Sequence, residues 1–139
     1  ENIFNVAQLN PDYIGHIFWE KSVRYIKGDT PQINNCKKTG VFYNSNYDFI
    51  CDKIEHHKLK CIQLHGDESP ELCQKLLNLK IEVIKSFRID QNFDFEILND
   101  YVNIQIINLT NYLTNSLNKN IRVDLVYLIE FPYYILLFF

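Results

Sequence analysis

The stretch 61–79 constrains the fold most, because it contains a buried strand, a polar turn and an amphipathic helix in direct succession. Its first four residues, Cys61–Leu64, are mostly apolar and end at a polar cluster, as a buried parallel strand does. Ser69 then suits the cap of a helix, and Pro70 suits its first position. His65 is therefore expected at the carboxyl end of a strand, which is the edge where α/β proteins bind ligands.

The same alternation of strand and helix extends over the first hundred residues. Further strands are expected at Tyr13–Phe18, Gly40–Tyr43 and Ile81–Phe87, and helices at about Glu1–Leu9, Asn46–His57 and Phe93–Tyr101. The segment Asp29–Lys38 is ambiguous and could form a short helix. This order predicts an α/β fold with a parallel sheet, either closed as a barrel or open and doubly wound. No glycine-rich dinucleotide fingerprint follows a strand, which weakens the doubly wound alternative.

Charge and cysteine spacing exclude several classes of function. The net charge is −3 and there is no basic block, so nucleic-acid binding has no electrostatic support. The four cysteines lack the close pairs of a zinc site, and we expect them to be reduced. No signal peptide is recognised, and the cytoplasm is the expected location.

The character of the sequence changes at Val102. All four glycines lie at or before Gly66, and residues 103–120 are rich in asparagine, isoleucine and leucine. Residues 125–139 are apolar and aromatic, but they are fewer than the ~20 that a membrane-spanning helix needs. We therefore expect two parts, a domain of residues 1–101 and a divergent apolar tail of residues 102–139, with no contact to a membrane.

Five phrases of the first part follow one another at matching spacings: Pro11–Phe18, Lys21–Tyr25, Gly40–Phe42, Gln63–Pro70 and Val83–Arg88. Together they resemble the phosphoribosylanthranilate isomerase family of tryptophan biosynthesis. The resemblance implies a (β/α)8 TIM barrel, of which about four parallel strands with their helices are present. It also implies an aldose–ketose isomerase of aromatic amino-acid biosynthesis that uses no metal and no cofactor.

The implied reaction is the Amadori rearrangement of N-(5-phosphoribosyl)anthranilate, so a phosphorylated small molecule is the expected partner. In the family the general base is a cysteine after the first barrel strand, and the general acid is an aspartate after the sixth. Neither has a counterpart in this sequence, so no catalytic residue is assigned. We expect the resemblance to be incomplete at both ends, the start being cut and the tail out of frame or replaced. Impaired activity of this polypeptide is the corresponding expectation.

The resemblance assigns two substrate-binding residues, Arg24 and His65. Arg24 corresponds to an arginine that pairs with the substrate's carboxylate, a task suited to the planar guanidinium, although a solvated loop arginine is the alternative. His65 could line the pocket or anchor a loop. Gln63 is expected to be a structural amide in the packed interior, and Asp67 and Glu68 to be charges in a turn before a helix.

The other histidines and cysteines are expected to be structural. His16 is expected to pack in the core, although a place at the pocket rim is possible, and Cys61 and Cys73 to be buried as small apolar residues. His56 and His57 are adjacent near a helix end and point in different directions, so we expect no metal site.

A rival hypothesis is a non-catalytic barrel remnant or an interaction module. The first and fourth strands of a four-stranded fragment would be uncovered edges, which the apolar tail or a partner chain could cover. The oligomeric state is left open by the sequence.

Overall fold

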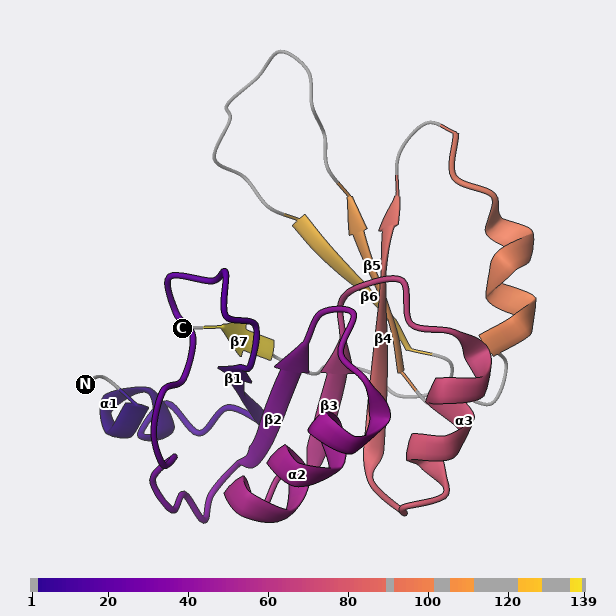
Figure 1. The fold of residues 1–139 in the computed structure, drawn as a ribbon. Coiled ribbons are helices and arrows are strands. Elements are labelled where there is room, and N and C mark those ends of the chain that lie inside the picture. The colour runs from indigo at the N-terminus through magenta and orange to yellow at the C-terminus, as the bar shows by residue number, and fades with distance from the viewer. Residues whose placement is uncertain (1–2, 90–91, 102–105, 112–122, 129–135, 139) are drawn as a thin grey trace.

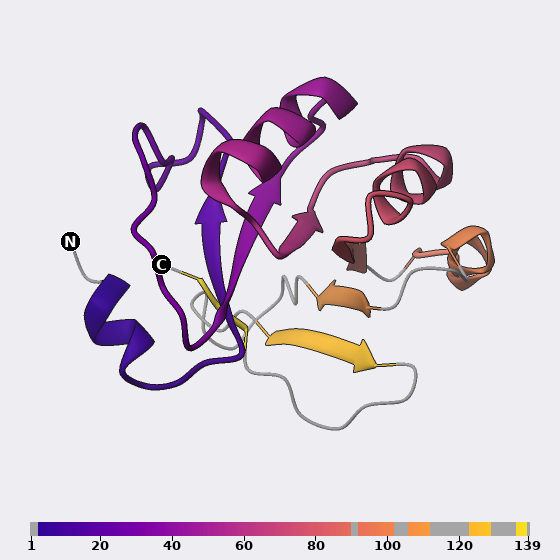
Figure 2. The same ribbon diagram turned by 90° about the horizontal axis from the view of Figure 1, so that it is seen from below.

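The strands form one curved sheet that carries helices on its convex face (Figures 1 and 2). The computed structural model describes residues 3–89, 92–101, 106–111, 123–128 and 136–138. Within these residues seven strands pair in the order β6-β5-β4-β3-β2-β1-β7. The elements are α1 (Ile3–Ala7), β1 (Tyr13–Ile17), β2 (Lys37–Phe42), α2 (Tyr47–His57), β3 (Cys61–Leu64), α3 (Pro70–Leu77), β4 (Glu82–Ile89), η1 (Phe95–Tyr101), β5 (Ile106–Asn111), β6 (Val123–Leu128) and β7 (Leu136–Phe138).

Strands β1 to β5 run parallel, each beside its neighbour in sequence. The register places Val41 of β2 between Ile17 of β1 and Gln63 of β3. Parallel neighbours need a crossover connection, and α2 and α3 lie in the crossovers that follow β2 and β3. The expected set of four adjacent parallel strands with helices is therefore confirmed, and β5 extends it.

The tail adds strands to both edges of this parallel unit. β5 pairs with β4, β6 pairs antiparallel with β5, and β7 pairs parallel with β1. The first and fourth strands are thus not uncovered edges, and segments of the tail cover both. The antiparallel β6 departs from the all-parallel order of a (β/α)8 barrel. The division of the chain after residue 101 stays a prediction.

The helix boundaries follow from their capping residues. Asn46 Oδ1 accepts a hydrogen bond from Phe49 N at 2.8 Å at the start of α2. Ser69 Oγ accepts one from Leu72 N at 3.3 Å at the start of α3, and Asn78 is the cap at its end. Ser69 was expected as a cap from the sequence, and Asn46 was expected as the start of its helix. None of the described helices combines the length and apolar character that crossing a membrane requires.

Three expected elements differ from the structure. No helix forms in Asp29–Lys38, because its last two residues already belong to β2, and Lys37 N donates to Asp12 O at 2.8 Å beside β1. The first helix is shorter than expected and covers Ile3–Ala7, while residues 1 and 2 lie outside the described residues. The helix expected at Phe93–Tyr101 is a 3₁₀ helix that begins at Phe95.

The main core lies between the sheet and helices α2 and α3. Phe42 of β2, Leu64 of β3 and Val83 of β4 are fully buried there with Ile50 of α2 and Leu76 of α3. Successive side chains of a strand point to opposite faces of the sheet. The residues of β2, β3 and β4 that alternate with these core residues therefore face the concave side of the sheet.

Candidate functional site

Both residues that the sequence singles out as ligands follow the carboxyl ends of parallel strands. Arg24 lies in the loop after β1 and His65 lies directly after β3, with β2 between these two strands. The carboxyl ends of parallel strands meet at one edge of the sheet, which is where α/β folds bind ligands. The structure therefore brings Arg24 and His65 to the same edge, and their roles as ligands stay predictions.

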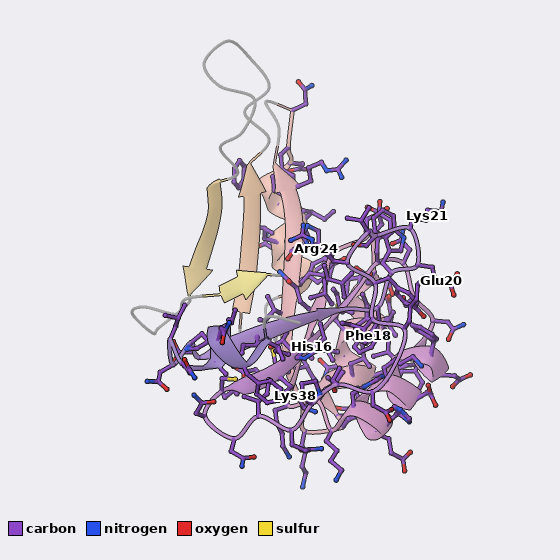
Figure 3. All side chains as sticks on the ribbon, turned by 90° about the vertical axis from the view of Figure 1, so that its left-hand side faces the viewer. His16, Phe18, Glu20, Lys21, Arg24 and Lys38 are labelled. Carbon is purple, nitrogen blue, oxygen red and sulfur yellow. The ribbon has the colours of Figure 1, made fainter. Side chains whose placement is uncertain are left out.

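The loop that carries Arg24 is closed onto β1 by backbone hydrogen bonds. Ile26 N donates to Ile17 O at 3.0 Å, so the chain returns to the strand that it has just left. Inside the loop, Arg24 N donates to the Ser22 hydroxyl oxygen at 3.2 Å. The Arg24 side chain is exposed, and it lies on the side of the loop nearer the strand ends, whereas Lys21 lies at its outer margin (Figure 3).

His65 continues the sheet beyond the end of β3, since its N donates to Phe42 O at 2.9 Å. Its side chain is half-buried. Gln63, two residues earlier, is fully buried and donates from Nε2 to Ser86 Oγ at 2.7 Å. Gln63 is thus the structural amide that the sequence predicts. His65 is expected on the same side of the strand as Gln63, beyond its carboxyl end.

A buried carboxylate joins the loops after β2 and β3. Glu68 Oε1 accepts a hydrogen bond from Asn44 N at 2.8 Å, and Glu68 Oε2 accepts one from Gly66 N at 3.0 Å. The Glu68 side chain is only 1% exposed. Glu68 lies in the turn before α3, as expected. Its burial was not expected, and its carboxylate satisfies two backbone donors inside the protein.

Lys85 of β4 pairs with this carboxylate and was missed from the sequence. Its Nζ lies 3.4 Å from Glu68 Oε2 and donates to the carbonyl oxygens of Gly66 at 2.7 Å and Ser86 at 2.9 Å. Burial lowers the pKa of Lys85, and the negative charge of Glu68 opposes that effect. One signal was available: Lys85 occupies the alternating position between Val83 and Phe87, both of which are buried in the core on the helix side.

Replacing Gly66 with alanine is expected to force the loops after β2 and β3 apart. A Cβ at this position would lie 2.6 Å from the backbone nitrogen of Asn44 and 2.7 Å from Asn44 Cγ. The side chain of Asn44 can rotate, but its backbone cannot move without disturbing the bond to Glu68. We expect a loss of about 1–3 kcal/mol in the free energy of unfolding, measured by urea denaturation.

Gly28→Ala is the matched control, since a Cβ at Gly28 meets nothing within 4 Å. Equal effects of the two substitutions would show that crowding at Gly66 is not the cause.

A second polar group lies on the helix side of the sheet, away from the candidate ligands. His16 is 1% exposed, with Nδ1 at 3.1 Å from Ile14 O. Nearby, Lys38 Nζ donates to Thr30 Oγ1 at 3.2 Å, and that hydroxyl lies 3.3 Å from His57 Nδ1. The expectation that His16 packs in the core is confirmed, so this histidine does not belong to the candidate site.

The buried thiols are unsuited to acid–base work at the candidate edge. Cys61 begins β3 at the opposite, amino end, and burial raises the pKa of its thiol far above the usual range. Cys73 is in α3, and burial raises the pKa of its thiol to about 11. Among the residues that the structure describes, no three histidine, cysteine or acidic side chains are grouped to hold a metal ion.

Comparison with known proteins gives one family consistently. Residues 1–111 match the family model for N-(5'-phosphoribosyl)anthranilate isomerase. The isomerase of Parabacteroides distasonis is 38% identical over 109 residues, which are 73% of this chain and 49% of that relative. The isomerase of Thermotoga neapolitana is 31% identical over 143 residues, covering 96% of this chain and 69% of the relative.

Solved structures agree with the sequence matches. A monomeric form of the phosphoribosylanthranilate isomerase of Thermotoga maritima has a TM-score of 0.68 and 29% identity, over 81% of this chain and 61% of that one. A phosphoribosylanthranilate isomerase in complex with reduced 1-(o-carboxyphenylamino)-1-deoxyribulose 5-phosphate has a TM-score of 0.67 and 28% identity, over 81% and 60%. The chain thus spans about half the length of relatives such as the Parabacteroides protein. On the family match over residues 1–111, the chain belongs to the N-(5'-phosphoribosyl)anthranilate isomerase family.

Proposed function

We propose that the chain functions in the cytoplasm as a phosphoribosylanthranilate isomerase, whose substrate is N-(5-phosphoribosyl)anthranilate. The observation that carries this proposal is the family match over residues 1–111, which includes Arg24 and His65 at one edge of the sheet. The cysteines of the described residues are free, which fits a reducing compartment. Residues 102–139 are proposed to be a second, divergent part of the chain, and its described strands β5, β6 and β7 join the sheet of the first part.

Arg24 is proposed to bind the carboxylate of the anthranilate group. The Arg24 side chain is exposed, so its guanidinium is accessible to a ligand. The backbone hydrogen bond from Ile26 to Ile17 restricts the movement of the loop that carries it. A planar guanidinium can donate two parallel hydrogen bonds to a carboxylate, and such charge-assisted pairs are stronger than neutral ones. His65, half-buried at the end of β3, is proposed to donate a hydrogen bond within the same pocket.

The ligand found in one relative supplies the probe. Reduced 1-(o-carboxyphenylamino)-1-deoxyribulose 5-phosphate stands in for the rearranged product, and it carries the same carboxylate as the substrate. We expect the 139-residue chain to bind this compound in isothermal titration calorimetry. Arg24→Met is expected to weaken binding roughly ten- to hundredfold, because one charge-assisted interaction is lost.

Lys21→Met is the matched control, since it removes a cation from the outer margin of the same loop (Figure 3). Equal affinity of the Arg24→Met variant and the unsubstituted chain would contradict the proposed role.

The expectation of impaired turnover is tested on the same preparation, by following the fluorescence of phosphoribosylanthranilate during the reaction. Near-normal turnover would overturn it.

A further inference from the structure

The aromatic side chains of Trp19 and Tyr43 are in contact just beyond the carboxyl ends of β1 and β2. The ring centroids of Trp19 and Tyr43 are 4.9 Å apart, with the ring planes inclined by 36°. Trp19 keeps 38% of its surface exposed despite this contact, and Tyr43 is half-buried. Part of the Trp19 surface therefore remains accessible beside the strand ends.

The direction of these rings follows from the strands that precede them. Phe18 N donates to Val41 O at 2.8 Å, so the pairing of β1 with β2 continues one residue past β1. Phe18 and Phe42 stack at 5.4 Å in the core on the helix side. From the alternation of side chains along a strand we infer that Trp19 and Tyr43, each one residue further on, face the concave side of the sheet.

Trp19 and Arg24 belong to the same compact loop. Ser22 N donates to Trp19 O at 2.9 Å, and Tyr25 N donates to Ser22 O at 3.1 Å, so two turns separate the aromatic ring from the guanidinium. The loop holds an exposed ring and an exposed cation on a backbone that is fixed at both ends. This combination suits a ligand that has an aromatic ring and an acidic substituent.

We propose that Trp19 and Tyr43 form an aromatic wall that binds the ring of an aromatic carboxylate, and that this wall selects aromatic over aliphatic acids. The inference rests on the proposed function, in which Arg24 binds the carboxylate. The wall contributes ring-on-ring contacts that an aliphatic ring of the same size cannot reproduce.

The experiment uses the fact that Trp19 is the only tryptophan of the chain, so its fluorescence reports on this wall alone. The probes are anthranilate and its saturated counterpart, cis-2-aminocyclohexanecarboxylate. Free tryptophan amide is titrated in parallel to correct for light that anthranilate absorbs. We expect anthranilate to quench Trp19 saturably and to bind about three- to tenfold more tightly than the saturated acid.

Tyr43→Leu is expected to abolish most of this preference, by weakening anthranilate about three- to tenfold while leaving the saturated acid unchanged. Tyr43→Phe is expected to restore the preference, because it keeps the ring. Phe95→Leu, which removes an aromatic ring that is 58% exposed on η1, is the matched control and is expected to change neither affinity. Urea denaturation of each variant separates a loss of binding from a loss of folding.

Each outcome bears on one part of the argument. If anthranilate leaves Trp19 fluorescence unchanged, or both acids bind equally well, the aromatic wall is wrong. It is also wrong if Tyr43→Leu lowers stability but keeps the preference, since the two rings then only pack the loop. Arg24→Met is expected to weaken both acids; if it weakens neither while Tyr43→Leu acts as expected, the proposed carboxylate role fails and the wall stands.

Discussion

Replacing Lys85 with methionine is expected to lower the free energy of unfolding by about 3–5 kcal/mol, because it leaves the buried carboxylate of Glu68 without its cation. The side chains of the pair are only 2% and 1% exposed, so water cannot take the place of the missing ammonium. Methionine fills nearly the same volume, which makes loss of charge pairing the main change. The backbone donors of Asn44 and Gly66 still hold the carboxylate, which favours the lower end of this range.

A double-mutant cycle with Glu68→Gln tests this explanation. The double variant is expected to be more stable than Lys85→Met alone, because the remaining amide carries no charge. Lys53→Met is the matched surface control: Lys53 pairs with Asp52 at 3.0 Å, but Asp52 is mostly exposed, and we expect little change. If the two single losses at Lys85 and Glu68 simply add, the pair is not coupled and the argument fails.

The strand–turn–helix units were predictable because their signals are local. The cap Ser69 and the first helical residue Pro70 adjoin in sequence, and the apolar run Cys61–Leu64 precedes them by a short turn. Parallel order then follows from alternation of strand and helix, and it places Arg24 and His65 at one edge without any knowledge of side-chain contacts.

Contacts between distant segments were not predictable in this way. The Glu68–Lys85 pair joins a turn to the middle of another strand. The apolar neighbours Val83 and Phe87 indicate that Lys85 is buried, but no local pattern identifies Glu68 as its partner. The contact of Trp19 with Tyr43 depends on the register of β1 and β2, which no single stretch encodes. The pairing of β7 with β1 joins the two ends of the sequence. The apolar character of the tail indicated that it could cover an edge strand, but it did not indicate which strand would pair with which.

Acidification below pH 6.5 is expected to destabilise the protein through His16, by up to about 3 kcal/mol when pH 4 is reached. Burial lowers the pKa of His16 to about 4 from the ordinary 6.5, and the nearby positive charges of Lys38 and His57 act in the same direction. The hydrogen bond with the Ile14 carbonyl opposes them. Between pH 6.5 and 4, His16 is therefore protonated in the unfolded chain but mostly neutral in the folded protein. The free energy of unfolding consequently falls as pH falls.

The contribution of His16 is isolated by comparing urea denaturation of the unsubstituted chain and His16→Phe at several pH values. Burial also lowers the pKa of His57, and nearby Lys53 lowers that of Asp52, so acid sensitivity of other origin remains in both proteins. The slope of the unfolding free energy against pH is compared for the two proteins, and the difference reports the protonation of His16. A change in packing caused by phenylalanine shifts the whole curve and leaves this difference in slope unaffected. We expect the unsubstituted chain to lose about 1.4 kcal/mol more per pH unit over this window. If the free energies of unfolding of the two proteins fall equally with pH, His16 gains its proton in the folded protein as readily as in the unfolded chain. That result would contradict the burial of His16 on the helix side of the sheet.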